Sequence, residues 1–249
     1  MTSEAQNQIH LGVIGNPIKQ SPSPKMCMAA ISDLGIEAEY KAILLQETDL
    51  ENYVEKIRKD ELHGFNVTIP FKELIIPFLD ELTEAAQQIQ AVNTVYHQNG
   101  KAIGHNTDGS GYIKSLESDL NYFLSSKHVV LNGAGGAAKA IAFALCQQGI
   151  KSLMILNRNR ERAENLVQEL GFRFPDAVFS SAVFNELDKE DWKDFDLFIN
   201  ATSQGMLGKE EWSNFLFLDF LKPDVVVSDI VANPVWTKLL KEAKQKKLK

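Results

Sequence analysis

The chain has 249 residues, 44% of them hydrophobic, which is enough for one large domain or two modest ones with an apolar core. Its formal net charge of −7 argues against general nucleic-acid binding. No apolar stretch approaches the ~20 residues of a membrane span, and the first residues do not resemble a signal peptide. Cys27 and Cys146 fall inside predicted helices among apolar neighbours, which predicts free thiols in the cytoplasm and no metal site.

Strand and helix patterns alternate through the first hundred residues, which predicts a mostly parallel sheet with helices packed against it. We expect strands at 11–15, 39–44 and 64–69, and helices at 23–34, 48–59 and 83–90. Ser23 is the expected N-cap of the first helix, and a capping box at 48–51 is expected to open the second. Asn99-Gly100, between strands at 94–97 and 101–104, predicts a type I′ hairpin at an antiparallel edge.

Polar side chains gather where these strands end. Asn66 and Thr68 are two residues apart and share one face of a strand, and Lys72 follows closely. Ligands of open α/β sheets bind at the carboxyl ends of the strands. The set of candidate polar residues also includes Ser21, Ser23, Asn93 and Asp108. Taken singly, each candidate also has an ordinary structural interpretation, such as a cap or a strand end. Together they suit a small, hydroxylated, anionic substrate.

A glycine-rich turn separates an apolar strand near 129–131 from an apolar helix. Its spacing is G-x-G-x-x-A, with Gly133, Gly135 and Ala138 at the small-residue positions. In dinucleotide-binding folds the first glycine allows the turn, the second lets the backbone approach a pyrophosphate, and the third small residue lets helix pack on strand. A tight turn often needs glycine in any case, but the strand and helix on either side favour dinucleotide binding.

The next predicted strand, 153–156, ends in a basic segment. An NAD site usually has Asp or Glu there, on the ribose 2′-hydroxyl. This chain has Arg158, Arg160 and Arg162 within the segment 157–162. An exposed basic helix start is the structural alternative, although the helix dipole disfavours cations at that end. Because guanidinium groups bind phosphate well, the segment predicts NADP rather than NAD.

The remaining patterns complete an α/β chain of two domains. A helix is expected from 107, buried strands at 197–200 and 225–230, and a last helix with Pro234 at its first position. We expect a substrate domain at 1–106, a Rossmann-like NADP-binding domain at 107–233, and a cleft between them. The last segment, 234–249, is expected to return to the first domain as a helix.

Several motifs together resemble the shikimate dehydrogenase family, in order and spacing, over residues 10 to about 240. They include Asn66–Lys72, Ala91–Thr94, Gly104–Gly109 and Asn200–Met206. The resemblance implies reversible NADPH-dependent reduction of 3-dehydroshikimate to shikimate, in chorismate and aromatic amino-acid biosynthesis. It implies that Lys72 and Asp108 form the catalytic pair and that the substrate is bound by Ser21, Ser23, Asn66, Thr68, Lys72, Asn93 and Asp108. It implies a cofactor site formed by Gly133, Ala134, Gly135, Gly136, Ala137, Asn157, Arg158, Arg162, Asn200, Thr202 and Met206.

The chain departs from the family pattern at two places. Ala232 stands where the family usually has a tyrosine, and the family continues past Lys249 with a glutamine that reaches the substrate. Two alternatives to an NADP-dependent shikimate dehydrogenase therefore stay open. One is a quinate/shikimate dehydrogenase with relaxed cofactor use, and the other is a catalytically weakened NADP-binding homologue. A monomer or a homodimer is expected.

Overall fold

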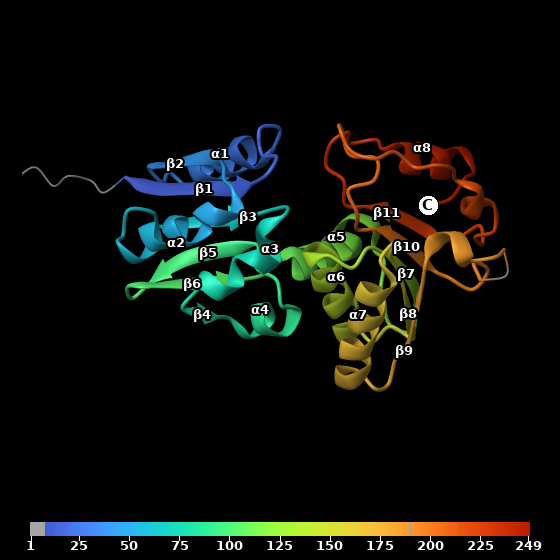
Figure 1. Ribbon diagram of the computed structural model, residues 1–249. Coiled ribbons are helices and arrows are strands. Elements are labelled where there is room, and N and C mark those ends of the chain that lie inside the picture. Colours follow the sequence, from blue (N-terminus) through green and yellow to red (C-terminus); the bar gives the residue numbers. More distant parts are fainter. Residues whose placement is uncertain (1–7, 190) are drawn as a thin grey trace, which may run out of the picture. The chain divides into compact units, whose positions relative to one another are not determined.

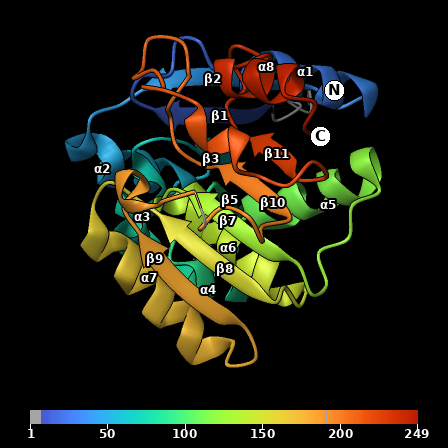
Figure 2. The same cartoon turned by 90° about the vertical axis from the view of Figure 1, so that its right-hand side faces the viewer.

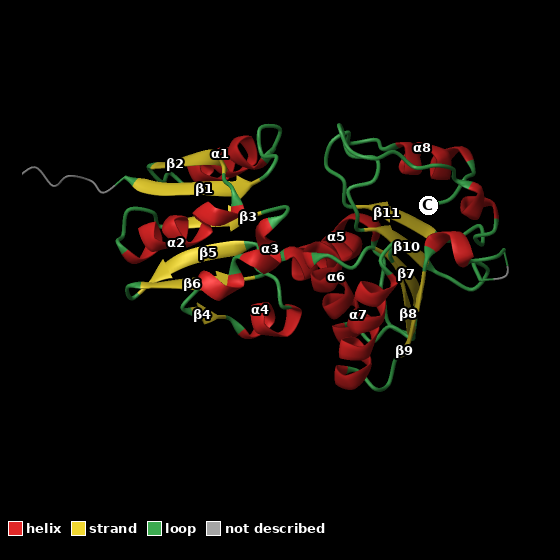
Figure 3. Cartoon of the chain, viewed as in Figure 1, coloured by secondary structure: helices red, strands yellow, loops and turns green. Residues whose placement is uncertain are grey.

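The computed structural model describes residues 8–189 and 191–249. The chain forms two compact units, and the division falls between Thr107 and Asp108 (Figure 1). Strands alternate with helices in both units, as the secondary-structure colouring of Figure 3 makes clear. Within the described ranges, no helix is both long and apolar enough to cross a bilayer. The predicted α/β class with two units is confirmed.

The first unit is built on a six-stranded sheet in the order β2-β1-β3-β5-β6-β4. Strands β1, β2 and β3 are parallel, whereas β5 runs antiparallel to both β3 and β6. The hairpin between β5 and β6 is confirmed, since Asn99 and Gly100 have φ of 53° and 76°, as a type I′ turn requires. It does not form the edge, because the short β4 pairs outside β6. The strands are β1 Ile9–Gly15, β2 Ala38–Leu44, β3 Gly64–Val67, β4 Glu81–Leu82, β5 Thr94–Gln98 and β6 Lys101–His105.

Helices pack on both faces of this sheet, because successive residues of a strand point to opposite sides. Ile14 belongs to the larger core, which also contains the buried side chains of α2. Val13 and Tyr40 belong to a smaller cluster with residues of α1 on the other face. The helices of this unit are α1 Ser23–Asp33, α2 Leu50–Arg58, α3 Phe71–Leu74 and α4 Glu84–Ile89.

Three further local predictions in this unit are wrong. Ser23 is not the N-cap of α1, because Pro22 before it already has near-helical angles, and Pro22 makes no side-chain cap. Instead of a capping box at 48–51, a 3-10 helix at Glu47–Asp49 precedes α2, and the Asp49 carboxylate accepts from the Gln46 backbone N–H. The strand predicted to 69 ends at Val67, because a turn closed by the Phe71 N–H and the Thr68 carbonyl leaves the sheet there.

The second unit contains a five-stranded, fully parallel sheet in the order β11-β10-β7-β8-β9. Counted within the unit, this order is 3-2-1-4-5 from β9 to β11, the arrangement of dinucleotide-binding sheets. The edge strand β9 was not expected, because its two serines and partly exposed side chains give a weak apolar signal. The strands are β7 His128–Asn132, β8 Ser152–Leu156, β9 Val178–Ala182, β10 Leu197–Asn200 and β11 Val226–Asp229.

Helices α5 Asp108–Leu120, α6 Gly136–Gln147 and α7 Arg160–Arg173 lie together along one side of this sheet (Figures 1 and 2). The other side carries an aromatic core. Phe198 and Trp192 pack there with the 3-10 helix Leu216–Asp219 and with α8, Lys238–Gln245.

The last segment differs from the prediction in two respects. Its helix begins at Lys238 rather than at Pro234, and the buried Thr237 is the N-cap, accepting from the Leu240 backbone N–H. The helix belongs to the second compact unit, residues 108–249. Leu239 is fully buried in the core of the second unit, and α8 packs beside β11. The strongly amphipathic sequence of this helix has its apolar partner within its own unit.

Candidate functional site

In the first unit, the predicted substrate residues lie on the side of the sheet where its parallel strands have their carboxyl ends. Strands β1 and β3 end on this side, and the antiparallel β5 begins there. Thr68 follows β3 directly, and its backbone N–H donates to the Ile14 carbonyl at 3.0 Å. Ser21 and Ser23 follow β1, where the Ser21 hydroxyl accepts from the Ser23 backbone N–H at 3.3 Å. Because parallel strands share one carboxyl edge, residues far apart in the chain become neighbours here.

Asn66 and Asn93 are linked by side-chain hydrogen bonds. The Nδ2 group of Asn66 lies 3.3 Å from the Asn93 carbonyl and 3.2 Å from the Thr94 hydroxyl. The Oδ1 atom of Asn66 accepts from the Tyr40 hydroxyl at 2.6 Å. The Nδ2 group of Asn93 donates to the Thr107 hydroxyl at 2.8 Å. The two predicted substrate amides therefore belong to one connected set of hydrogen bonds.

Three of these partners were not predicted as site residues, namely Tyr40, Thr94 and Thr107. For two of them, position in the sequence was a signal that could have identified them. Thr94 and Thr107 are directly adjacent in sequence to the predicted residues Asn93 and Asp108. Tyr40 gave no such signal, because it lies in another strand, 26 residues before Asn66.

Lys72 and Asp108 are placed in different units. Lys72 lies in the short helix α3, and its carbonyl accepts from the Val92 backbone N–H at 2.7 Å, one residue before Asn93. This bond ties the lysine backbone to the segment that carries the Asn93 amide. Asp108 is the first residue of α5 and of the second unit. The expected pairing of the two side chains stays a prediction.

The glycine turn between β7 and α6 has the geometry that its sequence predicts. Gly133 has φ of 129°, and an added Cβ would lie 2.9 Å from the Ala201 carbonyl oxygen, so a side chain is excluded there. At Gly135 no atom lies within 4 Å of an added Cβ, which leaves open space beside the backbone. Gly136 and Ala137 form the first turn of α6, whose N-terminal N–H groups favour a phosphate. These features fit a dinucleotide pyrophosphate.

The arginines of the basic segment after β8 differ in exposure and in hydrogen-bond partners. Arg158 follows the strand, and its side chain is 92% exposed, with Glu210 3.8 Å away. Arg160 is bound by Glu186 at 2.6 Å. Asn159 caps α7 by accepting from the Arg162 backbone N–H at 3.0 Å, and Asn157 donates to the Asn159 carbonyl. An exposed guanidinium at this strand end fits a ribose 2′-phosphate.

A buried polar network joins the ends of three strands in this unit. Asn200, which has no exposed surface, ends β10, and its Oδ1 accepts from the Thr202 hydroxyl at 2.7 Å. Its Nδ2 donates to Asp229 at the end of β11, at 2.9 Å. Asn132 ends β7 and donates to Asn200 at 3.3 Å. Met206 lies in the loop after Thr202 and is half-buried. Asn132 and Asp229 were not predicted as site residues. The sequence signal that could have identified them is that each, like Asn200, is a polar residue at the end of an apolar strand.

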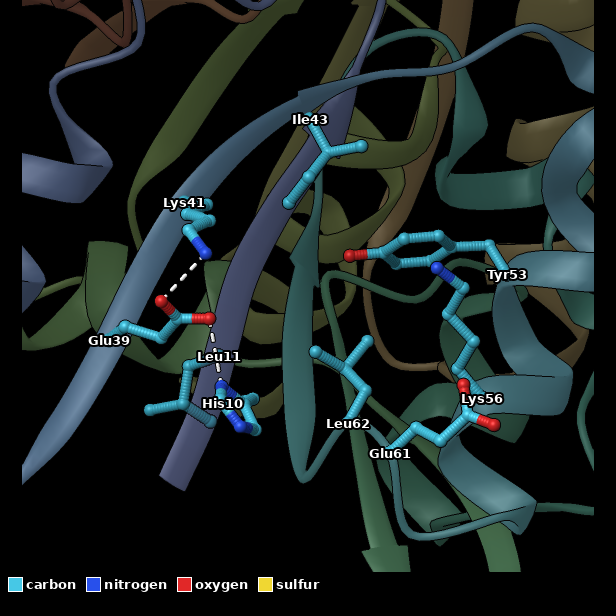
Figure 4. A pocket seen from close by; sticks show the side chains of 9 residues that line it. All are labelled: His10, Leu11, Glu39, Lys41, Ile43, Tyr53, Lys56, Glu61 and Leu62. Carbon is cyan, nitrogen blue, oxygen red and sulfur yellow. Dashed lines mark hydrogen bonds and ion pairs between the residues drawn. The ribbon is translucent and has the colours of Figure 1, made fainter. Parts of the chain in front are cut away.

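One cavity in the first unit lies away from the predicted site residues. It measures about 380 Å³ and opens beside the first residues of β1 and β2, near α2 (Figure 4). Glu39 on its wall binds both His10 and Lys41, at 2.8 and 2.6 Å, which holds the pKa of this carboxyl below its usual range. The cavity therefore lies toward the amino ends of the strands, whereas the predicted substrate residues lie at the carboxyl ends.

The cysteines and acidic residues do not add a second site. Burial raises the pKa of the Cys146 thiol to about 12, so it is protonated at neutral pH. Cys27 is half-buried and unpaired with any other cysteine. Among the residues at 8–189 and 191–249, no group of three or more His, Cys, Asp or Glu is arranged to hold a metal ion.

Two family models match the chain. The model described as the shikimate dehydrogenase substrate binding domain matches residues 13–95, and the model described as shikimate / quinate 5-dehydrogenase matches residues 116–231. The NADP(+)-dependent shikimate dehydrogenase of Alkaliphilus oremlandii is 40% identical over 236 residues, which cover 94% of this chain and 82% of the relative. That of Bacillus mycoides is 42% identical over 234 residues, covering 94% and 83%.

Solved structures agree with these matches. A shikimate dehydrogenase in complex with NADP+ superposes with a TM-score of 0.87 at 37% identity, covering 97% of this chain and 83% of that one. The Thermus thermophilus enzyme in complex with NADP(H) and shikimate has a TM-score of 0.84 at 31% identity, covering 97% and 86%. A quinate dehydrogenase of Corynebacterium glutamicum with NAD has 0.81 at 30%, covering 97% and 86%.

Proposed function

The chain belongs to the shikimate dehydrogenase family, and we propose that it catalyses the reversible, NADP-dependent reduction of 3-dehydroshikimate to shikimate in chorismate biosynthesis. The observation that carries this proposal is the gathering of Asn66, Thr68 and Asn93 at one sheet edge, beside the segment that holds Lys72. Amides, hydroxyls and one ammonium suit a ring that bears hydroxyls and a carboxylate. Ser21 and Ser23, at the end of β1, would bind the carboxylate.

The cofactor would be held by the second unit. Gly133 to Ala137 would bind the pyrophosphate at the start of α6, and Arg158, with Asn157 and Arg162, would bind the 2′-phosphate. Asn200, Thr202 and Met206 would line the nicotinamide region. When bound, NADPH supplies the hydride that the reduction needs.

Lys72 and Asp108 would perform the proton chemistry. As the substrate carbon gains the hydride, its carbonyl oxygen develops negative charge and takes up a proton. The Lys72 ammonium would stabilise that charge and donate the proton, and the Asp108 carboxylate would orient the lysine and accept a bond from a substrate hydroxyl. In the oxidative direction the neutral amine of Lys72 would receive the proton from the shikimate hydroxyl, as the hydride leaves to NADP.

A single assay tests this function. Purified protein is given shikimate and NADP, and NADPH formation is followed; the assay is repeated with quinate and with NAD. Turnover with shikimate and NADP at the highest kcat/KM supports the proposal. Comparable turnover of quinate with NAD would support the alternative of a quinate/shikimate dehydrogenase, which the name of the second family model and the quinate dehydrogenase structure favour. NADP binding without turnover would identify a catalytically weakened homologue.

We also propose that the enzyme works in the cytoplasm as a monomer or homodimer, without nucleic-acid partners. Two unpaired cysteines suit a reducing compartment, and the net charge of −7 disfavours binding to nucleic acid. Size-exclusion chromatography with light scattering would distinguish the two oligomeric states.

A further inference from the structure

A continuous chain of side-chain hydrogen bonds runs through the first unit. The Tyr40 hydroxyl donates to Asn66 Oδ1 at 2.6 Å, and Asn66 Nδ2 donates to the Thr94 hydroxyl at 3.2 Å. The Thr94 hydroxyl donates to Asn93 Oδ1 at 2.9 Å, and Asn93 Nδ2 donates to the Thr107 hydroxyl at 2.8 Å. In every hydrogen bond of this chain the donor lies on the Tyr40 side and the acceptor on the Thr107 side.

Backbone groups determine this direction at two points. The Thr107 backbone N–H donates to Asn93 Oδ1 at 3.1 Å, and since an N–H cannot accept, that atom of Asn93 must be oxygen. The atom of Asn66 that faces the Asn93 carbonyl at 3.3 Å must be nitrogen, because a carbonyl cannot donate. Both amides therefore have a single allowed orientation, which side-chain contacts alone would leave ambiguous.

Tyr40 is the donor toward Asn66, because an amide oxygen can only accept. The residue is 9% exposed, and burial raises the pKa of its hydroxyl above the usual value, so the proton is retained. The Oδ1 atom of Asn66 faces it and accepts. The tyrosine lies in β2 and the asparagine in β3, with β1 between them in the sheet.

The hydrogen-bond capacity of Asn66 shows what it can offer a ligand. Its two Nδ2 protons are directed to the Asn93 carbonyl and the Thr94 hydroxyl, and one lone pair of Oδ1 receives the Tyr40 proton. No further bond to Oδ1 comes from residues 8–189 or 191–249, so its second lone pair can accept. Toward a ligand, Asn66 can therefore act only as an acceptor, which suits a hydroxyl group and not a carboxylate.

We propose that Tyr40 and Thr94 are positioning residues that lock Asn66 with its oxygen toward the substrate, so that it selects a ring hydroxyl. This inference rests on the proposed function for the identity of the substrate. Neither residue needs to touch the substrate, because each acts on it through the orientation of the Asn66 amide. The remote Tyr40 thus contributes to recognition of the hydroxyl from two strands away.

The kinetic test compares Tyr40→Phe and Thr94→Val with matched controls. Tyr40→Phe removes only the donor to Asn66, and Thr94→Val removes the hydroxyl that accepts from Asn66 and donates to Asn93. Each is expected to lower kcat/KM for shikimate roughly three- to tenfold through a higher KM, with the KM for NADP within about twofold of wild type. Thr94→Ser keeps the hydroxyl and should restore most of the loss. Tyr96→Phe, in β5 of the same sheet, should change neither constant.

Because both links act on one amide, the double variant Tyr40→Phe/Thr94→Val should lose less than the product of the single losses. An unchanged KM for shikimate in both single variants, or an equal rise in the KM for NADP, would overturn the inference. A failure of Thr94→Ser to restore the KM would also count against it, since a purely structural role of the threonine would not depend on its hydroxyl.

A second readout needs no turnover and separates this inference from the proposed function. In the ligand-free protein, the side-chain amide resonances of Asn66 should shift in Tyr40→Phe and in Thr94→Val but not in Tyr96→Phe. If wild-type protein does not oxidise shikimate while these resonances shift as expected, the proposed substrate is wrong and the locked amide stands. If the Asn66 resonances stay unmoved in both variants, the lock itself is refuted, whatever the enzyme turns over.

Discussion

The side-chain amide of Asn200 donates to a carboxylate oxygen of Asp229 at 2.9 Å, and this bond joins the ends of β10 and β11. The same carboxylate accepts from the Thr237 hydroxyl at 2.7 Å and from the Val231 backbone N–H at 3.1 Å. Since Thr237 is the N-cap of α8, one carboxylate connects two strand ends to the start of the last helix. It has no cationic partner among these contacts.

The surroundings of Asp229 predict a pH dependence of stability. Burial raises its pKa above the usual 3.8, although hydrogen bonds from Thr237, Val231 and Asn200 oppose the shift. A carboxyl with a raised folded pKa binds its proton more tightly in the folded state. Its stabilising contribution is therefore complete below pH 3.8 and is lost as pH rises through the folded pKa.

We expect the free energy of unfolding of wild type, minus that of Asp229→Asn, to fall as pH rises from about 4 to about 7. The asparagine retains an oxygen acceptor for Asn200 and Val231 but does not titrate. Urea unfolding at several pH values measures the difference. A difference that stays level or grows with pH would show that Asp229 has no raised pKa.

Lys72→Ala is expected to lower kcat for shikimate oxidation by about 10²- to 10⁴-fold, because the developing charge on the substrate oxygen would lose its proton partner. The Kd for NADPH, measured by fluorescence titration, should stay within about twofold of wild type, since Lys72 lies in the first unit. Lys56→Ala is the matched control. That lysine belongs to the same unit but lies over the Tyr53 ring, beside the cavity of Figure 4. Equal losses of turnover and NADPH binding in Lys72→Ala would contradict the catalytic role.

The arginines after β8 offer a matched pair for cofactor choice. Arg158→Ala should raise the KM for NADP about tenfold or more and leave the KM for NAD nearly unchanged, because only NADP carries the 2′-phosphate that a guanidinium binds. Arg160→Ala should have little effect on either cofactor, since Glu186 already binds that guanidinium at 2.6 Å. Steady-state kinetics with both cofactors measures the two ratios. A larger effect of Arg160 than of Arg158 would reassign the phosphate contact.

Local patterns predicted the fold well where one residue type has one structural use. Gly133 at φ of 129° and the Asn99-Gly100 turn were foreseen because few other residues adopt positive φ cheaply. Caps were predicted poorly, since Ser23 and the segment 48–51 compete with neighbours that satisfy the same backbone groups. The short edge strand β4 and the serine-containing β9 lack the periodicity that reveals a buried strand.

Long-range contacts set the limit for the candidate site. Asn66 and Asn93 were identified from their positions near strand ends, but the bond from Tyr40 could not be, because it depends on the register of β2 and β3 against β1. The location of α8 was missed for a related reason. Its apolar face is evident from the sequence, whereas its partner, the aromatic core around Phe198, becomes evident only when the second sheet is assembled.

Helices α5 and α6 approach each other closely, which predicts opposite effects on stability when two glycines of α5, two residues apart, are replaced by alanine. A Cβ added at Gly109 would lie 2.3 Å from the Ala140 carbonyl oxygen and 2.9 Å from the Ala144 Cβ, so the helices would have to separate. A Cβ added at Gly111 has no atom within 4 Å, and its φ lies outside the left-handed region. The two positions lie in the same helix and differ in what faces them.

Gly109→Ala should lower the free energy of unfolding by about 1–3 kcal/mol, the usual cost of overpacking a contact that cannot relax. Gly111→Ala should raise it by about 0.5–1 kcal/mol, because alanine loses less backbone entropy in a helix than glycine does. Denaturant unfolding of both variants and of wild type gives the two signs directly. A loss of stability in both would show that the chain near Asp108 requires glycine for flexibility, and stabilisation in both would show that α5 and α6 are not in close contact at Gly109.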